Sequence, residues 1–116
     1  MHKFDLEKRT LTFNKNIINL CKKLPKNSMN NRLVGQIVGS AGSIGANYRE
    51  ANDCLGKKDF VLRLKIARKE AKETTYWLEL LGEANDDIHS DIEKLLKESI
   101  ELTNILSAII KKFNLS

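Results

Sequence analysis

The feature that most constrains the fold is a run of apolar and small residues whose spacing alternates between four and three positions without a break. This spacing places every member on one side of an α-helix and is typical of helices that pack along their whole length. Within residues 57–84 the run consists of Phe60, Leu64, Ala67, Ala71, Thr74, Leu78 and Leu81. A second run, in and just before residues 90–113, consists of Ile88, Ile92, Leu95, Ser99, Leu102, Leu106, Ile109 and Phe113. Both segments are predicted to be long amphipathic helices.

Two further helices are predicted upstream, over residues 5–24 and 31–54. Apolar residues in the first of these follow the same spacing, and Pro25 then ends the helix. The length of 116 residues suits one domain, and the single proline and low aromatic content argue against an all-β sandwich. The sequence therefore predicts one all-α domain over residues 1–116, an up-down-up-down four-helix bundle.

The expected helix starts carry residues that favour capping. Asn30 or Ser28 is a suitable N-cap for the second helix, because a short polar side chain can accept a hydrogen bond from a first-turn amide. Ser90 and Glu93 have the spacing of a capping box at the start of the fourth helix.

The second predicted helix is unusually rich in glycine, with four of the six glycines of the chain in residues 34–52. At about 100° per residue, one side of this helix is formed by Gly35, Gly39, Gly42 and Ala46. Such a smooth side allows a neighbouring backbone to approach closely. A nucleotide-binding loop is disfavoured, because the glycine spacing does not match GxGxxG and no GK[ST] follows.

Each predicted helix carries a second apolar or small line beside the residues expected in the core. This surplus predicts that the bundle associates with copies of itself. The alternative is a broad core with scattered apolar residues on the surface, which is common in monomers.

Catalytic and metal chemistry find little support in the sequence. His2 and His89 are the two histidines, and neither has the partners of a metal site or a catalytic triad. Cys21 and Cys54 lie far apart, outside any CxxC pattern, and are expected to be small core residues in a reducing cytoplasm. Neither a membrane span nor a signal peptide is expected. We predict a protein that is not an enzyme and that needs no metal or cofactor.

The strongest functional signal is a concentration of basic residues in the third predicted helix. Residues 57–72 hold seven Lys and Arg against two acids, whereas residues 73–101 hold two against nine. The candidate nucleic-acid-binding residues are Lys58, Arg63, Lys65, Arg68, Lys69 and Lys72. Lys58, Lys65, Arg68 and Lys72 are expected to share one helical face, with Arg63 and Lys69 nearby, and such a face can neutralise backbone phosphates with little readout of sequence. The alternative is an ordinary solvated helix surface, perhaps paired with the acidic residues of the fourth helix.

Other polar and aromatic residues of the middle helices were assigned to packing or to a polar network. Glu50 is expected to pair with a basic residue of the third helix, Glu73 with Lys69, and Glu70 with Arg49. The complete expected network is Asn47, Arg49, Glu50, Glu70 and Glu73. The expected oligomer or packing interface adds Tyr76 and Trp77 to the small residues of the second helix.

Two stretches, "SIGANYREAN" (residues 43–52) and "KKDFVLRLKIARKEAKETTYWLELLGEA" (residues 57–84), resemble a bacterial family of four-helix bundles. The family was first met as proteins encoded in intervening sequences of 23S ribosomal RNA genes, and it includes the accessory variability determinants of diversity-generating retroelements. The resemblance is strong over residues 33–84, whereas the first and last helices match in pattern only. It implies a small cytoplasmic protein without known catalysis that forms a ring-like homopentamer. For retroelement members it also implies binding to nucleic acid and to a reverse transcriptase.

The leading hypothesis is a nonenzymatic, homo-oligomeric helical bundle that binds RNA or DNA through basic helix surfaces, as an accessory factor of a nucleoprotein or retroelement system. The alternative is a scaffold that binds a protein partner and has no role with nucleic acid.

Overall fold

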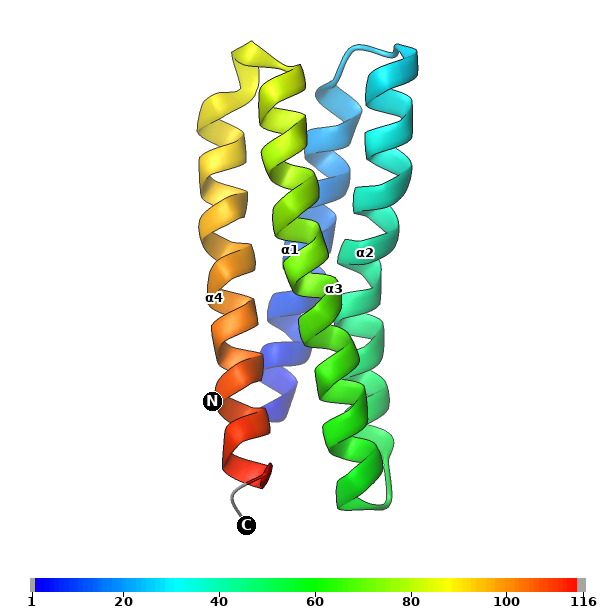
Figure 1. The fold of residues 1–116 in the computed structure, drawn as a ribbon, viewed down its shortest axis with the longest axis vertical. Coiled ribbons are helices and arrows are strands. Elements are labelled where there is room, and N and C mark those ends of the chain that lie inside the picture. Colours follow the sequence, from blue (N-terminus) through cyan, green and yellow to red (C-terminus); the bar gives the residue numbers. More distant parts are fainter. Residues whose placement is uncertain (1, 115–116) are drawn as a thin grey trace.

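The computed structural model describes residues 2–114, which form an antiparallel bundle of four long helices (Figure 1). The elements are α1 (Lys3–Lys23), α2 (Ser28–Asp53), α3 (Lys57–Ala84), a short 3₁₀ helix η1 (Asp86–Ile88) and α4 (His89–Asn114). The body measures 47 × 20 × 20 Å. Each helix contacts the next along the chain and α4 also contacts α1, so that α1 and α3 lie on one diagonal. The predicted all-α, up-down-up-down bundle is confirmed.

The helix starts differ from the sequence-based expectations because other side chains form the caps. His2 caps α1, accepting a hydrogen bond from the Phe4 amide, while Asp5 bonds back to the His2 amide. Asn27 caps α2 and accepts from the Asn30 amide at 2.8 Å, so the expectation that Asn30 or Ser28 is the cap was wrong.

The start of α4 also differs from its expected form. The turn of η1 leads directly into α4 at His89. Ser90 therefore lies inside the helix, and the expected capping box with Glu93 is not present.

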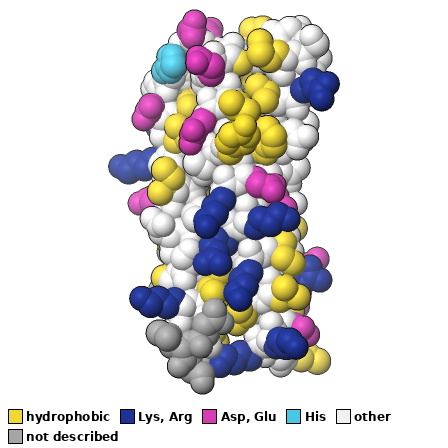
Figure 2. Space-filling view, in the orientation of Figure 1, with side chains coloured by type: hydrophobic (Ala, Val, Ile, Leu, Met, Phe, Trp, Pro, Cys, Tyr) yellow, Lys and Arg dark blue, Asp and Glu magenta, His cyan; other side chains and the backbone are white. Residues whose placement is uncertain are grey.

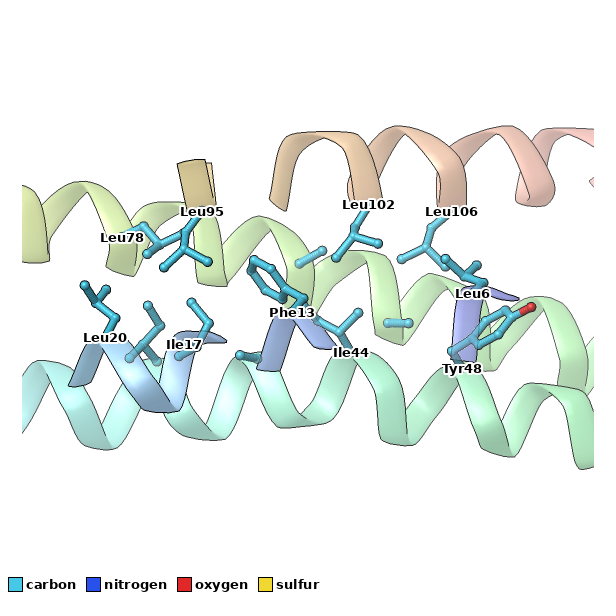
Figure 3. Close-up of a cluster of buried hydrophobic side chains, with 14 of the residues drawn as sticks. Leu6, Phe13, Ile17, Leu20, Ile44, Tyr48, Leu78, Leu95, Leu102 and Leu106 are labelled. Carbon is cyan, nitrogen blue, oxygen red and sulfur yellow. The ribbon is translucent and has the colours of Figure 1, made fainter. Parts of the chain in front are cut away.

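The core is formed by the apolar runs of all four helices, and Figure 3 shows their side chains meeting along the axis of the bundle. Fully buried members of this core include Leu6, Phe13, Ile17, Ile44, Leu78, Leu102 and Leu106. Because the buried positions repeat every three and four residues, each turn of each helix contributes at least one side chain to the same interior.

The contact between α2 and α3 is the most extensive in the bundle. Ala67 of α3 is fully buried and lies seven residues before Thr74, on the side of α3 that bonds to α2. The hydroxyl groups of Ser40 and Thr74 hydrogen-bond across this contact at 2.8 Å. A second hydroxyl pair, Thr75 with Ser99, joins α3 to α4 at 2.8 Å.

A buried pair of asparagines joins the two turns at one end of the bundle. The Asn30 and Asn85 side chains exchange two amide hydrogen bonds, of 3.0 and 2.8 Å. Asn30 also donates to the Pro25 carbonyl and Asn85 to the Leu81 carbonyl. Each amide is thereby supplied with partners despite its burial, as a stable buried polar group requires.

The contact between α1 and α4 is the least extensive, and charged groups bridge it. Arg9 Nη2 and Nε donate to the two oxygens of Glu98, each at 2.7 Å, and Nη2 also reaches Glu101 at 3.0 Å. The hydrogen bond from Arg9 lowers the pKa of Glu98 below its ordinary value. A hollow of about 380 Å³ opens along this contact and is lined by His2, Leu6, Tyr48, Ile105, Ala108, Ile109 and Lys112.

Both cysteines are half-buried thiols, with no disulfide between them. Burial raises the pKa of the Cys21 thiol, which lowers its reactivity at neutral pH. Within residues 2–114, the helices all fall short of the length and apolar character that crossing a membrane requires.

Candidate nucleic-acid interface

The outward side of the first half of α3 carries a straight row of lysines. We call this row, Lys58, Lys65, Lys69 and Lys72, the lysine strip. At about 100° per residue its members lie within roughly 60° of one another around the helix. With a rise of 1.5 Å per residue, the strip is about 21 Å long. All four side chains are exposed.

The lysine strip carries uncompensated charge. Within the described part of the chain, ion pairs of basic side chains involve Arg9, Lys23 and Arg63, and no member of the strip. Because no carboxylate lies within ion-pair distance of these four ammonium groups among the described residues, the strip is a site of positive potential.

Two other basic residues of α3 that were expected to bind nucleic acid lie outside the strip. Arg63 points toward α2, where its Nη1 atom pairs with Glu50 at 2.7 Å and donates to Asn47 at 3.2 Å. Arg68 points toward α4, is half-buried and donates to the Ser107 hydroxyl at 3.5 Å. Arg63 is therefore a structural contact between helices, and Arg68 borders the strip.

Sequence reasoning missed Lys111 as a neighbour of these residues. Lys111 is exposed and follows Ser107, the partner of Arg68, by one helical turn on α4. The last two predicted helices are antiparallel, so the end of the fourth helix lies beside the basic start of the third, and this would have been the signal for Lys111. Figure 2 shows Lys and Arg side chains gathered over the lower half of this face.

The second half of α3 has the opposite character. Glu79 and Glu83 are exposed there. Tyr76 is exposed and lies one turn beyond Lys72, while Trp77 is half-buried against the core. The two rings pack edge to face with centroids 5.1 Å apart. Acidic and hydrophobic side chains predominate over basic ones in the upper half of the same face in Figure 2, and the exposed carboxylates of Glu79 and Glu83 follow the strip along α3.

A hollow of about 580 Å³ lies beside the lysine strip, lined by Lys57, Lys58, Asp59, Val61, Leu62 and Lys65. Leu62 is exposed on its wall, and Leu55 is fully exposed in the turn before α3. The hollow gives the basic surface a concave, partly apolar section, suited to the sugar edge of a nucleic-acid backbone between two phosphate contacts.

The expected polar network is formed in part. Glu50 pairs with a basic residue of α3 as expected, and Asn47 joins it on the same Arg63 side chain. The pairing of Glu70 with Arg49 was wrong, because Arg49 lies on the side of α2 that faces α1, where it lines a hollow of about 190 Å³.

Glu73 is exposed and forms no ion pair with Lys69 within the described residues. Its charge instead acts on Glu70. Burial and, secondarily, the charge of Glu73 raise the pKa of the Glu70 carboxyl. The ionised form of Glu70 is therefore slightly disfavoured by the fold.

The small side of α2 is divided between α1 and open space. A Cβ atom added to Gly42 would lie 3.4 Å from the Asn14 amide nitrogen of α1, and one added to Gly45 would lie 3.1 Å from the Thr10 hydroxyl. At Gly35 and Gly39 an added Cβ would meet no atom within 4 Å. Ala46 is exposed. Part of this side is therefore covered by α1, and the part around Gly35 and Gly39 is bare.

The comparisons with known proteins agree with this geometry. The profile of the 23S rRNA-intervening sequence protein family matches residues 2–108. The chain belongs to this family. A crystal structure of a protein of unknown function from the S23 ribosomal protein family of Bacteroides thetaiotaomicron is 38% identical, covers 96% of this chain and 99% of its own, and superposes with a TM-score of 0.86. None of the curated proteins matches the chain.

This 23S rRNA-intervening sequence family protein shows no cluster of acidic, histidine or cysteine side chains suited to a metal ion within residues 2–114. His2 is engaged as the cap of α1, and His89 is exposed at the start of α4. The basic surface of α3 is therefore the feature of this family member that most clearly offers a binding chemistry.

Proposed function

We propose that this protein is a nonenzymatic, homo-oligomeric helical bundle of the cytoplasm that binds nucleic acid through the lysine strip. The observation that carries the proposal is the strip itself, four exposed lysines in a row about 21 Å long on one helix. Arg63 of the same helix points away from the strip, toward α2, where it pairs with Glu50. The family description refers to 23S rRNA intervening sequences, and we propose with it an accessory role in a nucleoprotein or retroelement system.

Self-association has a separate support on the other side of the molecule. Phe4, Leu11 and Ile18 are exposed large apolar residues that recur every seven positions on α1, so they form a line along its outer side. The bare glycines of α2 add a backbone surface without side chains. An apolar line beside a smooth helix suits close packing against another helix of a sister chain, and a ring such as a homopentamer would repeat the lysine strip around its axis.

Nucleic-acid binding is tested by titrating labelled RNA and DNA with the protein at increasing salt. Lys65→Glu/Lys72→Glu is expected to abolish binding that the unaltered protein shows at low salt, because it reverses two charges in the middle and at the end of the strip. Lys15→Glu/Lys22→Glu is the matched control, since both residues are exposed on α1, diagonal to α3, with the same spacing of seven. No binding at low salt, or equal loss in both variants, contradicts the proposal.

Oligomerisation is tested with Gly39→Leu, measured by light scattering. The isolated subunit has room for a side chain at this position, so the helix content should not fall. The assembly should dissociate if α2 packs against a sister chain there. A monomeric unaltered protein contradicts the oligomer.

The second candidate function is a scaffold that binds a protein partner, and the exposed apolar line of α1 favours it. A pull-down with and without nuclease separates the two functions. Protein partners that survive digestion support the scaffold, whereas partners lost on digestion support binding through nucleic acid.

A further inference from the structure

We infer that the nucleic acid recognised by the lysine strip is a duplex rather than a single strand. This inference rests on the proposed function and specifies its ligand. It follows from three properties of α3: the rigidity of the strip, the position of the aromatic side chains, and the acidic residues that end the positive surface.

The lysine strip is held in a fixed line. Its Cα positions belong to a 28-residue helix that packs against α2 on one side and α4 on the other. A duplex also presents its phosphates in fixed positions, so the backbone is preformed on both sides and the loss of conformational entropy is confined to the lysine side chains. A single strand would have to be straightened along about 21 Å, which costs entropy at every nucleotide.

Aromatic side chains are absent from the strip within the described residues. Phe60 and Phe113, the aromatic rings that α3 and α4 contribute at this end of the bundle, are half-buried and pack edge to face on each other with centroids 4.9 Å apart. Proteins that bind single strands stack successive bases on aromatic rings. The basic surface thus offers contacts to phosphates without contacts to bases.

Tyr76 is the one exposed ring next to the strip, and its surroundings limit its use. It follows Lys72 by one turn, but Glu73, Glu79 and Glu83 are exposed around and beyond it. A strand that stacked a base on Tyr76 would bring its next phosphates toward these carboxylates, which is unfavourable. The strip therefore provides a phosphate-binding track with no continuation past Tyr76.

The length of the strip matches a short section of duplex. A strand of B-form duplex carries one phosphate per 3.4 Å of axis, so about six base pairs span the strip. Four lysines that neutralise about four phosphates give a slope of log K against log salt near −3.6 for a duplex and near −2.8 for a single strand. Taking equal affinities at about 1 M salt, these slopes give about tenfold tighter binding of the duplex at 50 mM salt.

The experiment compares a duplex with each of its separated strands by fluorescence anisotropy at 50 and 200 mM salt. RNA and DNA versions of one sequence form separate arms, and tighter binding of either duplex than of its strands supports the inference. We expect about tenfold preference for the duplex and a loss of about 150-fold in duplex affinity between the two salt concentrations.

Tyr76→Ala separates the two binding modes further. Because exposed carboxylates surround the ring, we expect Tyr76→Ala to leave the affinities for the duplex and for its strands unchanged, whereas loss of a ring that stacked bases would lower single-strand affinity roughly fivefold or more. Unchanged duplex affinity in Tyr76→Ala, together with loss in Lys65→Glu/Lys72→Glu, supports the inference. Single strands that bind as tightly as the duplex overturn it and leave the proposed function intact. If no form binds at 50 mM salt, the proposed function itself fails.

Discussion

The contacts of α3 with α2 and of α4 with α1 hold the same bundle together by different means. The first is close and extensive, built on small buried residues and joined by neutral hydrogen bonds. The second is sparse, has a hollow along it and is bridged by partly exposed ion pairs. α2 and α3 are therefore the most extensively packed pair of the bundle, and α3 carries the lysine strip.

The largest expected difference comes from adding volume to each contact. Ala67 is fully buried and lies four residues after Arg63 and seven before Thr74, which both bond to α2. Ala67→Leu should destabilise the fold by about 3 kcal/mol, because no space exists for the added atoms. Ala108→Leu, in the hollow beside α1, should change stability by less than about 0.5 kcal/mol. Urea unfolding followed by circular dichroism measures both, and equal costs would remove the distinction.

Neutral buried hydrogen bonds should come next in size. Asn85→Ala removes two hydrogen bonds to Asn30 and leaves a buried amide without its main partner. We expect a loss of about 2 kcal/mol in the free energy of unfolding. Because neither amide titrates, the difference between the variant and the unaltered protein should be the same at pH 4 and pH 7. A loss that depends on pH would show that the pair acts through charged neighbours.

The ion pair between α1 and α4 should have a smaller and pH-dependent effect. Arg9→Gln is expected to lower stability at pH 7 by at most about 1 kcal/mol, since the pair is partly exposed to solvent. Because Arg9 lowers the folded-state pKa of Glu98, its stabilisation is present above the ordinary glutamate pKa near 4.5 and is lost as the pH falls through the folded-state pKa. Thermal unfolding from pH 2 to pH 7 should therefore show the two proteins converging in acid.

The smallest expected effect is a gain in stability, and it concerns Glu70, on the side of α3 that faces α2. The pKa of Glu70 is raised, chiefly by burial, so protonation of this carboxyl favours the folded state. Glu70→Gln should raise stability at pH 7 by a few tenths of a kcal/mol, and the gain should vanish below the ordinary carboxyl pKa. Glu79→Gln is the control, because Glu79 is an exposed carboxylate further along the same helix. A destabilised Glu70→Gln at pH 7 would contradict this assignment.

The same two contacts show what could be predicted from the sequence. The long helices and the core followed from spacing alone, because the steps of four and three positions determine which side of each helix is buried. Glu50 was expected to bond to α3 and does, since its place on α2 faces that helix. Arg49, the adjacent residue, was assigned to the wrong neighbour because a rotation of 100° moves it to the α1 side.

Contacts between distant turns could not be predicted. The Asn30 and Asn85 pair joins residues 55 positions apart, and neither asparagine has a local pattern that distinguishes it from other turn residues. Arg9 and Glu98 are likewise 89 positions apart. The lysine strip was visible as a charged segment, but separating it from Arg63 required the position of α2.

The two hydroxyl pairs of α3 have a consequence for how the helices align lengthwise. An apolar seam that repeats every seven residues allows several offsets between neighbouring helices along the bundle axis. Sliding one helix by a heptad, about 10.5 Å, again brings apolar side chains together. Thr74 with Ser40 and Thr75 with Ser99 meet at only one of these offsets. In any other alignment the two hydrogen bonds between helices would be lost and each hydroxyl would keep only its bond to a carbonyl of its own helix, so this single polar level favours one vertical position of three helices.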